Sequence, residues 1–182
     1  MKILNTELQR VWTFDPAYTT VEFVVRNLWY RVKGRFGVVE GAIVLDEEDL
    51  SRSSVTATIR ADSIDTRNKK RDAHLLREFL DVENFPEIEF KSTSVKRGRD
   101  RDSLDVDGTL TVKGKSLPIA LAVNEMDRSR SPNGEEWVYY SATAELDRFA
   151  FGINYGRLFI GRRLKVMINV QARNTPHGLN GL

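Results

Sequence analysis

The stretch "VDGTLTVKGKSLPIAL", Val106 to Leu121, is the clearest guide to the fold of this chain. Before its Lys-Gly dipeptide, every second position from Val106 to Val112 is apolar or glycine. After it, the alternation returns with Ile119 and Leu121. A period of two is typical of a β-strand with one buried face. A short glycine-containing turn between two such runs predicts an antiparallel hairpin.

The same period recurs along most of the chain. Apolar residues alternate with more polar ones in runs that begin at Val21, Val39, Val55, Ile88, Val138 and Leu164. Charged or Pro-Asn-Gly turns separate several of these runs, at 96–102 and 129–136. About eight strands at regular spacing predict an antiparallel all-β architecture. Such a sheet forms either a sandwich or a closed barrel, and an eight-stranded barrel is filled by its own side chains or holds one small ligand.

Small residues on the proposed inward face leave two interpretations open. They would either fit the taper of a packed interior or leave a long apolar void. Pattern alone does not separate the two for Gly41, Ala57, Ala61, Gly108, Ala142, Ala144 and Ala172.

Composition narrows the class of protein. The 182 residues fit one domain, 1–182, with a motif-bearing core at 12–172 and a loose tail at 173–182. The chain has no cysteine, which excludes disulfides and thiolate sites, and its net charge of +2 is too small to imply a polyanionic partner. The sequence has no signal segment, so we expect a cytoplasmic protein, with a processed periplasmic or secreted form as the alternative.

One segment departs from the strand pattern: "RDAHLLREFLDVENFPEIEF", Arg71 to Phe90. Its apolar residues have helical spacing and predict an amphipathic helix over 67–80, with Asp65 or Thr66 as the N-cap. The Phe-Pro at 85–86 disfavours helix and predicts the start of the next strand. In a protein of strands, the apolar stripe of this helix would cover the mouth or outer wall of a barrel.

His74 lies on this helix, with Glu78 one turn further on. No serine, cysteine or metal-ligand spacing completes a catalytic set around it, so we expect no enzyme, no metal and no cofactor. The basic run at 67–71 is either a solvated helix entry or a cationic rim that meets a pyrophosphate or an anionic membrane surface. The cationic runs lack interleaved aromatic residues, which argues against nucleic acid.

Five segments in order resemble the YceI-like polyisoprenoid-binding family. The central one is "SIDTRNKKRDAHLLREFLDVENFPEIEFKSTS", Ser63 to Ser94. The others are "FDPAYTTVEFVVRNL" (14–28), "VKGRFGVVEGAIVLDEED" (32–49), "VDGTLTVKGKSLPIAL" (106–121) and "LDRFAFGINYG" (146–156) with "IGRRLKVMINVQA" (160–172). The resemblance implies a lipocalin-like, closed antiparallel eight-stranded barrel with one helix near its mouth. It also implies non-enzymatic binding, storage or transport of a long-chain isoprenoid or similar amphiphile in an apolar tunnel.

On this resemblance and the strand pattern, one set of residues is expected to line the tunnel: Phe23, Val25, Phe36, Ile43, Ala57, Ile59, Leu76, Phe79, Leu80, Phe90, Leu110, Leu121, Tyr140, Ala142, Ala144, Phe151 and Ile168. A second set is expected at the mouth, near the lipid head group: Asn27, Trp29, Tyr30, Arg71 and His74.

The chain departs from the family pattern near the expected mouth. Tyr18 and Asn27 stand where histidines are common, the loop 28–33 is shorter and more aromatic, and Phe79-Leu80 replaces Phe-Phe. The aromatic pair Trp29-Tyr30 is expected at the mouth or at a dimer contact, since dimers are common in the family. Two alternatives to a long-chain lipid carrier remain: a ligand-free structural or stress-response barrel, and a binder of shorter fatty acids or amides.

Overall fold

Strands from nearly the whole length of the chain pair into one antiparallel sheet. The computed structural model describes residues 9–174. In chain order, the strands are β1 (Gln9–Phe14), β2 (Thr20–Asn27), β3 (Arg31–Phe36), β4 (Val39–Asp46), β5 (Ser54–Arg60), β6 (Ile64–Asp65), β7 (Glu87–Arg97), β8 (Ser103–Val112), β9 (Lys115–Arg130), β10 (Glu136–Asp147) and β11 (Ile160–Asn174). The helical segments are η1 (Leu50–Arg52), η2 (Ala61–Ser63), α1 (Lys69–His74) and η3 (Leu75–Leu80).

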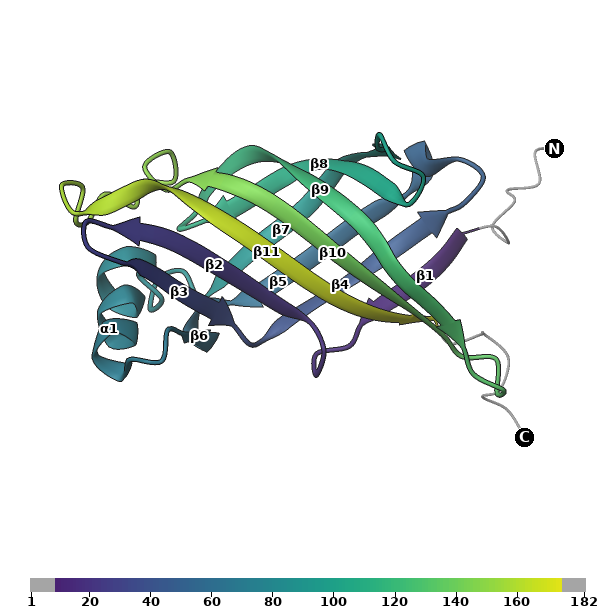
Figure 1. Ribbon diagram of the computed structural model, residues 1–182, viewed down its shortest axis with the longest axis horizontal. Helices are drawn as coiled ribbons and strands as arrows, with labels where there is room; N and C mark the ends of the chain where they lie inside the picture. The colour runs from purple at the N-terminus through teal and green to yellow at the C-terminus, as the bar shows by residue number, and fades with distance from the viewer. Residues whose placement is uncertain (1–8, 175–182) are drawn as a thin grey trace.

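The sheet closes on itself. Its strand order is β1-β4-β5-β7-β8-β9-β10-β11, and β11 pairs again with β1, which gives a ring of eight strands (Figure 1). β2 continues the position of β1 in the wall, because both pair with β11, β1 near Ala172 and β2 from Ile160 to Asn169. The predicted closed eight-stranded antiparallel barrel is therefore confirmed, and the sandwich alternative is wrong.

The opening stretch forms the β8–β9 hairpin. Val112 pairs with Lys115, and the two residues between them, Lys113 and Gly114, both have positive φ, 51° and 68°. Two central residues with positive φ are the signature of a type I′ turn, whose twist matches that of the strands on either side. The turn therefore fixes the register in which Val106, Leu110 and Leu121 share the inner face.

The predicted helix packs across one end of the barrel, on the left of Figure 1. It begins at Lys69 rather than at 67, and its N-cap is Asn68, whose side chain accepts a hydrogen bond from the backbone N–H of Arg71. The expectation that Asp65 or Thr66 caps the helix is wrong. Arg67 has a φ of 61°, so the helix cannot start before Asn68. From Leu75 to Leu80 the helix continues in π-helical form.

The inner wall carries the buried side chains, and the strand pattern assigned these faces correctly. Trp12, Val138 and Ala172 are among the least exposed of them. β11 extends through Asn174, so the first two residues of the predicted loose tail are strand, and 175–182 lie outside the described residues. Within residues 9–174, no helix has the length and apolar character needed to span a membrane.

Candidate functional site

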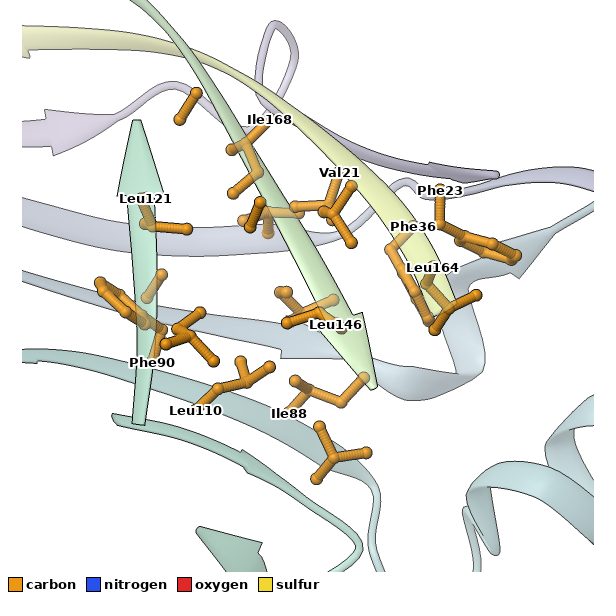
Figure 2. Close-up of a pocket in the computed structure, with 18 of the residues that line it drawn as sticks. Val21, Phe23, Phe36, Ile88, Phe90, Leu110, Leu121, Leu146, Leu164 and Ile168 are labelled. Carbon is orange, nitrogen blue, oxygen red and sulfur yellow. The ribbon is translucent and has the colours of Figure 1, made fainter. Parts of the chain in front are cut away.

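The interior of the barrel holds an apolar cavity of about 420 Å³. Small-molecule pockets generally occupy about 300–1,000 Å³. Figure 2 shows side chains from strands all around the wall converging on this space, among them Val21 and Phe23 of β2, Phe90 of β7 and Ile168 of β11. Because the lining is almost wholly carbon, the cavity suits an apolar guest rather than a polar one.

The residues expected to line a tunnel surround this cavity, with two exceptions. Leu76 does not line it, because the π-helical turns, which bond i to i+5, bring Leu75, Phe79 and Leu80 to the cavity side instead. Phe151 is buried in the turn after β10, outside the cavity. The lining residues placed as expected are Phe23, Val25, Phe36, Ile43, Ala57, Ile59, Phe79, Leu80, Phe90, Leu110, Leu121, Tyr140, Ala142, Ala144 and Ile168.

The depth of the cavity follows from β10. Tyr140, Ala142, Ala144 and Leu146 all line it, as expected for alternate residues of one strand face. From Tyr140 to Leu146 is a rise of about 20 Å along the strand. A tilt of about 40° reduces this to about 15 Å along the barrel axis. The cavity is therefore a long channel rather than a round void.

The small inward residues divide into three groups, which resolves the two open interpretations. An added Cβ at Gly108 would lie 2.3 Å from the ring of Phe90, and one at Gly41 would lie 2.5 Å from the ring of Phe14, so these glycines make room for aromatic rings. The alanines at 57, 142 and 144 line the cavity instead. Ala61, at the start of η2, and Ala172, on β11, are buried and do not line this cavity. Packing and void thus both occur, at different positions.

At the helix end, polar side chains ring the channel; we call this ring, Asn27, Tyr30, Arg71, His74 and Tyr155, the mouth. Tyr30 and Tyr155 are about half exposed although they line the cavity, so the channel reaches the surface here. Trp29, expected at the mouth, is 87% exposed and does not line the cavity.

The mouth is held by contacts between the helix and the loop before β11. The ring of His74 meets that of Tyr155 edge-on at 4.6 Å between centroids, and Phe79 lies 5.1 Å from the same tyrosine ring. Arg71 donates from Nε to Thr66 Oγ1 and from Nη2 to the Thr66 carbonyl, both at 2.8 Å. Aromatic contacts thus attach the helix to the loop before β11, and Arg71 joins the helix to Thr66, just ahead of its N-terminus.

Arg148, which also lines the cavity, is a buried cation, and its hydrogen-bond partners within residues 9–174 include no carboxylate. Its guanidinium donates to four backbone carbonyls, those of Ile153, Tyr155, Ile160 and Gly161, each at 2.8 Å. Burial, followed by repulsion from Arg157, lowers its pKa from the ordinary value for arginine. This side chain fixes the loop that carries Tyr155 to the mouth.

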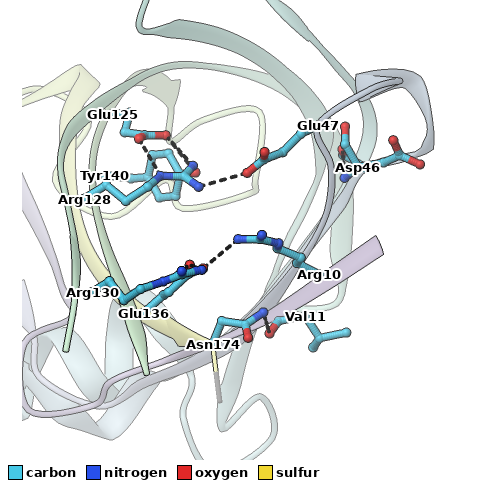
Figure 3. Close-up of polar contacts among 11 residues, drawn as sticks. Arg10, Val11, Asp46, Glu47, Glu125, Arg128, Arg130, Glu136, Tyr140 and Asn174 are labelled. Carbon is cyan, nitrogen blue, oxygen red and sulfur yellow. Dashed lines mark hydrogen bonds and ion pairs between the residues drawn. The ribbon is translucent and has the colours of Figure 1, made fainter. Parts of the chain in front are cut away.

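Polar contacts span the opposite end of the channel (Figure 3). Tyr140 lines the cavity with its ring and donates from its hydroxyl to Glu125 Oε2 at 3.3 Å. Arg128 binds Glu125 at 2.9 and 3.0 Å and reaches Glu47 at 2.9 Å, which links β9 to the segment after β4 on the far side of the ring. The ion pair therefore spans the barrel end beyond Tyr140.

Tyr140 cannot serve as a base in this setting. Burial raises the pKa of its hydroxyl, and the negative charge of Glu125 raises it further. The phenol therefore stays protonated. Among residues 9–174, no group of three or more His, Cys, Asp or Glu side chains is arranged to hold a metal ion.

Sequence reasoning missed Arg148 and Tyr155 as cavity residues. An isolated arginine usually indicates an exposed side chain, and the carbonyls that Arg148 binds lie 5–13 residues further along, two in a loop without a period and two at the start of β11. Tyr155 lies in the same loop, and its approach to His74 is a tertiary contact. The one available signal was the match of "LDRFAFGINYG" to the family's closing segment.

Comparison with known proteins gives a consistent result. Residues 12–172 match the YceI-like domain. "Protein YceI" of Salmonella arizonae is 32% identical over 159 residues, which cover 86% of this chain and 82% of the relative.

Solved structures share the fold. The crystal structure of Burkholderia cenocepacia BcnA superposes with a TM-score of 0.77 at 18% identity, covering 87% of this chain and 98% of that one. The Campylobacter jejuni YceI protein gives 0.72 at 24% identity, with coverage of 80% and 86%. A polyisoprenoid binding domain from Saccharophagus degradans gives 0.69 at 14% identity, with coverage of 90% and 98%. With this fold and the family match over 12–172, the chain belongs to the YceI-like family.

Proposed function

We propose that this protein binds a lipid whose long apolar tail, such as a polyisoprenoid chain, lies in the channel with its head group at the mouth. The observation that carries the proposal is the continuous apolar lining from Tyr140 to the mouth around a cavity of about 420 Å³. The solved neighbour from Saccharophagus degradans, described as a polyisoprenoid binding domain, supports the same ligand class.

Binding is driven by removal of the tail from water. Each buried methylene contributes about 0.8 kcal/mol. Ordering of the chain offsets much of this gain, because non-covalent affinities rarely exceed a free energy of about −18 to −21 kcal/mol. Since one methylene changes affinity by only ~1–3 kcal/mol in an apolar pocket, the channel should select tails by length and not by detailed shape.

The head group has few polar partners at the mouth. Arg71 already uses Nε and Nη2 on Thr66, and the side-chain oxygen of Asn27 accepts the N–H of Leu28. The remaining donors of Arg71 and the ring of His74 are free to meet a head group without breaking these contacts. Recognition of the head is therefore coarse, in keeping with storage or transport and not with catalysis.

Release of the lipid would require a change at the mouth. The helix, α1 with η3, is the element whose displacement would open the channel, because Phe79, Leu80 and His74 lie between the cavity and solvent at that end. A ligand-free structural barrel, by contrast, would have its interior filled by side chains. The alternative of shorter fatty acids or amides shares the channel and differs in the chain length bound.

The experiment is lipid identification. Native mass spectrometry of the purified protein, followed by organic extraction and mass spectrometry of the extract, should reveal one long-chain lipid per barrel. Repeated extraction without any lipid, together with failure of added polyprenols and fatty acids to bind, would refute the proposal.

A further inference from the structure

Exposed apolar side chains gather on two loops beside the mouth. Leu28, Trp29 and Tyr30 form the turn between β2 and β3 and are 57%, 87% and 54% exposed. Leu158 and Phe159 precede β11 and are 83% and 59% exposed. We call these five residues the docking patch. Large apolar side chains scattered singly are normal on a protein surface, but a contiguous group marks an interaction site.

The two loops of the docking patch are joined. The backbone N–H of Leu28 donates to the carbonyl of Phe159 at 3.0 Å, and Asn27 pairs with Ile160 in the sheet. Both loops project at the same end of the barrel as the helix (Figure 1). Since Asn27, Tyr30 and Ile160 also line the cavity, the docking patch adjoins the channel opening.

The segments that carry the docking patch are basic. Residues 26–33 contain Arg26, Arg31 and Lys33, residues 148–165 contain four arginines and a lysine, and neither segment contains an acidic residue. Arg26, Arg31 and Arg157 are exposed and take part in none of the ion pairs found among residues 9–174. Arg162 and Arg163 are paired with Asp147 and Glu145, so the uncompensated charge beside the apolar tips, within the described part of the chain, includes Arg26, Arg31 and Arg157.

We propose that the docking patch binds the surface of an anionic lipid bilayer and turns the mouth towards it. Tryptophan and tyrosine favour the interface between head groups and acyl chains, and leucine and phenylalanine favour the acyl side of it. Exposed arginines next to them are attracted to anionic lipids. A second copy of this chain fits the patch less well, because a symmetric contact would bring its arginines against those of the partner. Docking would then allow direct transfer of a lipid between channel and bilayer. The transfer step rests on the proposed function, whereas docking is independent of it.

The test is binding of the purified protein to vesicles of phosphatidylcholine with and without 30% phosphatidylglycerol, measured by flotation. We expect binding to the anionic vesicles only. The double variant W29S/L158S removes apolar tips that do not line the cavity, and it should lower the vesicle partition coefficient at least tenfold. The matched control is M126S. Met126 is also exposed, 66%, but it lies near the end of β9 that is remote from the mouth, so M126S should bind like the unaltered protein.

The electrostatic part is tested separately. Each cation at a membrane surface contributes about a fivefold change in partitioning, so R26Q/R31Q should weaken binding about 25-fold. K96Q/R99Q, at the opposite end of the barrel, should change it little. Trp29 also reports insertion directly. Of the other two tryptophans, Trp12 is only 1% exposed and Trp137 lies at the start of β10, at the end of the barrel away from the mouth. A blue shift of the emission and quenching by brominated lipids should therefore both be lost in W29F.

Three results would overturn the proposal. The first is equal binding to neutral and anionic vesicles, and the second is unchanged binding of W29S/L158S. The third is a protein that does not bind vesicles but sediments as a dimer, with W29S/L158S sedimenting as a monomer. The last would assign the docking patch to a second copy. Lipid extracted from W29S/L158S should match that from the unaltered protein. Vesicle binding without any lipid in the channel would refute the proposed function alone.

Discussion

A block at Ala144 tests the channel most directly. Ala144 lies on β10 between Ala142 and Leu146, lines the cavity, and pairs with Val166 of β11. In Ala144→Trp the indole would project into the channel and cut off the part between Ala144 and Tyr140. That part is about 14 Å long along the strand, or about 10 Å along the barrel axis.

The loss in affinity can be worked out from this length. An extended chain advances about 1.2 Å per bond, one third of the rise of an extended residue, so about eight methylenes are displaced. At about 0.8 kcal/mol each, they represent about 6 kcal/mol of burial. If ordering of the chain offsets about half, the net loss is about 3 kcal/mol, or roughly a hundredfold in Kd.

The assay is a titration with a series of ligands that share a head group and differ in tail length. For the unaltered protein, affinity should rise with length to a limit. For Ala144→Trp the limit should come about eight carbons earlier, and shorter ligands should bind equally to both. Thr143→Trp is the matched control, because Thr143 directly precedes Ala144 on the strand and its side chain is exposed. Equal affinity of Ala144→Trp and unaltered protein for the longest ligand, with both folded by circular dichroism, would refute the assignment of the channel.

Three further predictions concern the wall, the helix and the end of the channel beyond Tyr140. Gly108→Ala should lower the free energy of unfolding by about 1–3 kcal/mol, because its Cβ would lie 2.3 Å from the Phe90 ring. Gly37→Ala, with nothing within 4 Å, should cost less than Gly108→Ala in denaturant titration. Asn68→Ala should cost about 1 kcal/mol and speed hydrogen exchange at the start of α1; unchanged exchange there would contradict the cap. The raised pKa of Tyr140 contributes stability that is present below pH ~10 and is lost as pH rises above it. Tyr140→Phe should therefore lose less stability than the unaltered protein between pH 9 and 11; parallel pH profiles would rule this out.

The strand faces were predictable because a period of two reports which side of a wall is buried. The alternation at Val106–Val112 and Val138–Leu146 assigned inward residues, of which Val106, Leu110, Val112 and the alternate residues from Tyr140 to Leu146 line the cavity. The same pattern carries no information on where a strand breaks. β1 and β2 are separated at 15–19, although both occupy one position beside β11. Such a break depends on the hydrogen bonds of the neighbouring strand, which lies over a hundred residues away.

The mouth was harder to predict, since its residues come from loops and from a helix with irregular hydrogen bonding. Helical spacing placed Leu76 with Phe79 and Leu80, but the π-helical turns rotate Leu76 away from the cavity. Arg148 is positioned by four carbonyls, two in the loop before β11 and two at the start of β11, and no sequence pattern identifies carbonyl acceptors. Sequence therefore predicts a regular wall better than it predicts the structure at the end of that wall.

The stability of this barrel and its capacity for a ligand depend on different residues. The wall is held by long ladders, of which β10 with β11 is continuous from Glu136 to Asp147, and by aromatic rings seated on Gly41 and Gly108. Neither requires a filled centre, so the alanines at 57, 142 and 144 can leave the channel open at little cost to the wall. Enlarging an alanine should consequently shorten the ligand that fits, whereas enlarging a glycine should strain the wall itself. If the channel were only a packing defect, larger side chains at these alanines would stabilise the fold, and no ligand affinity would be lost.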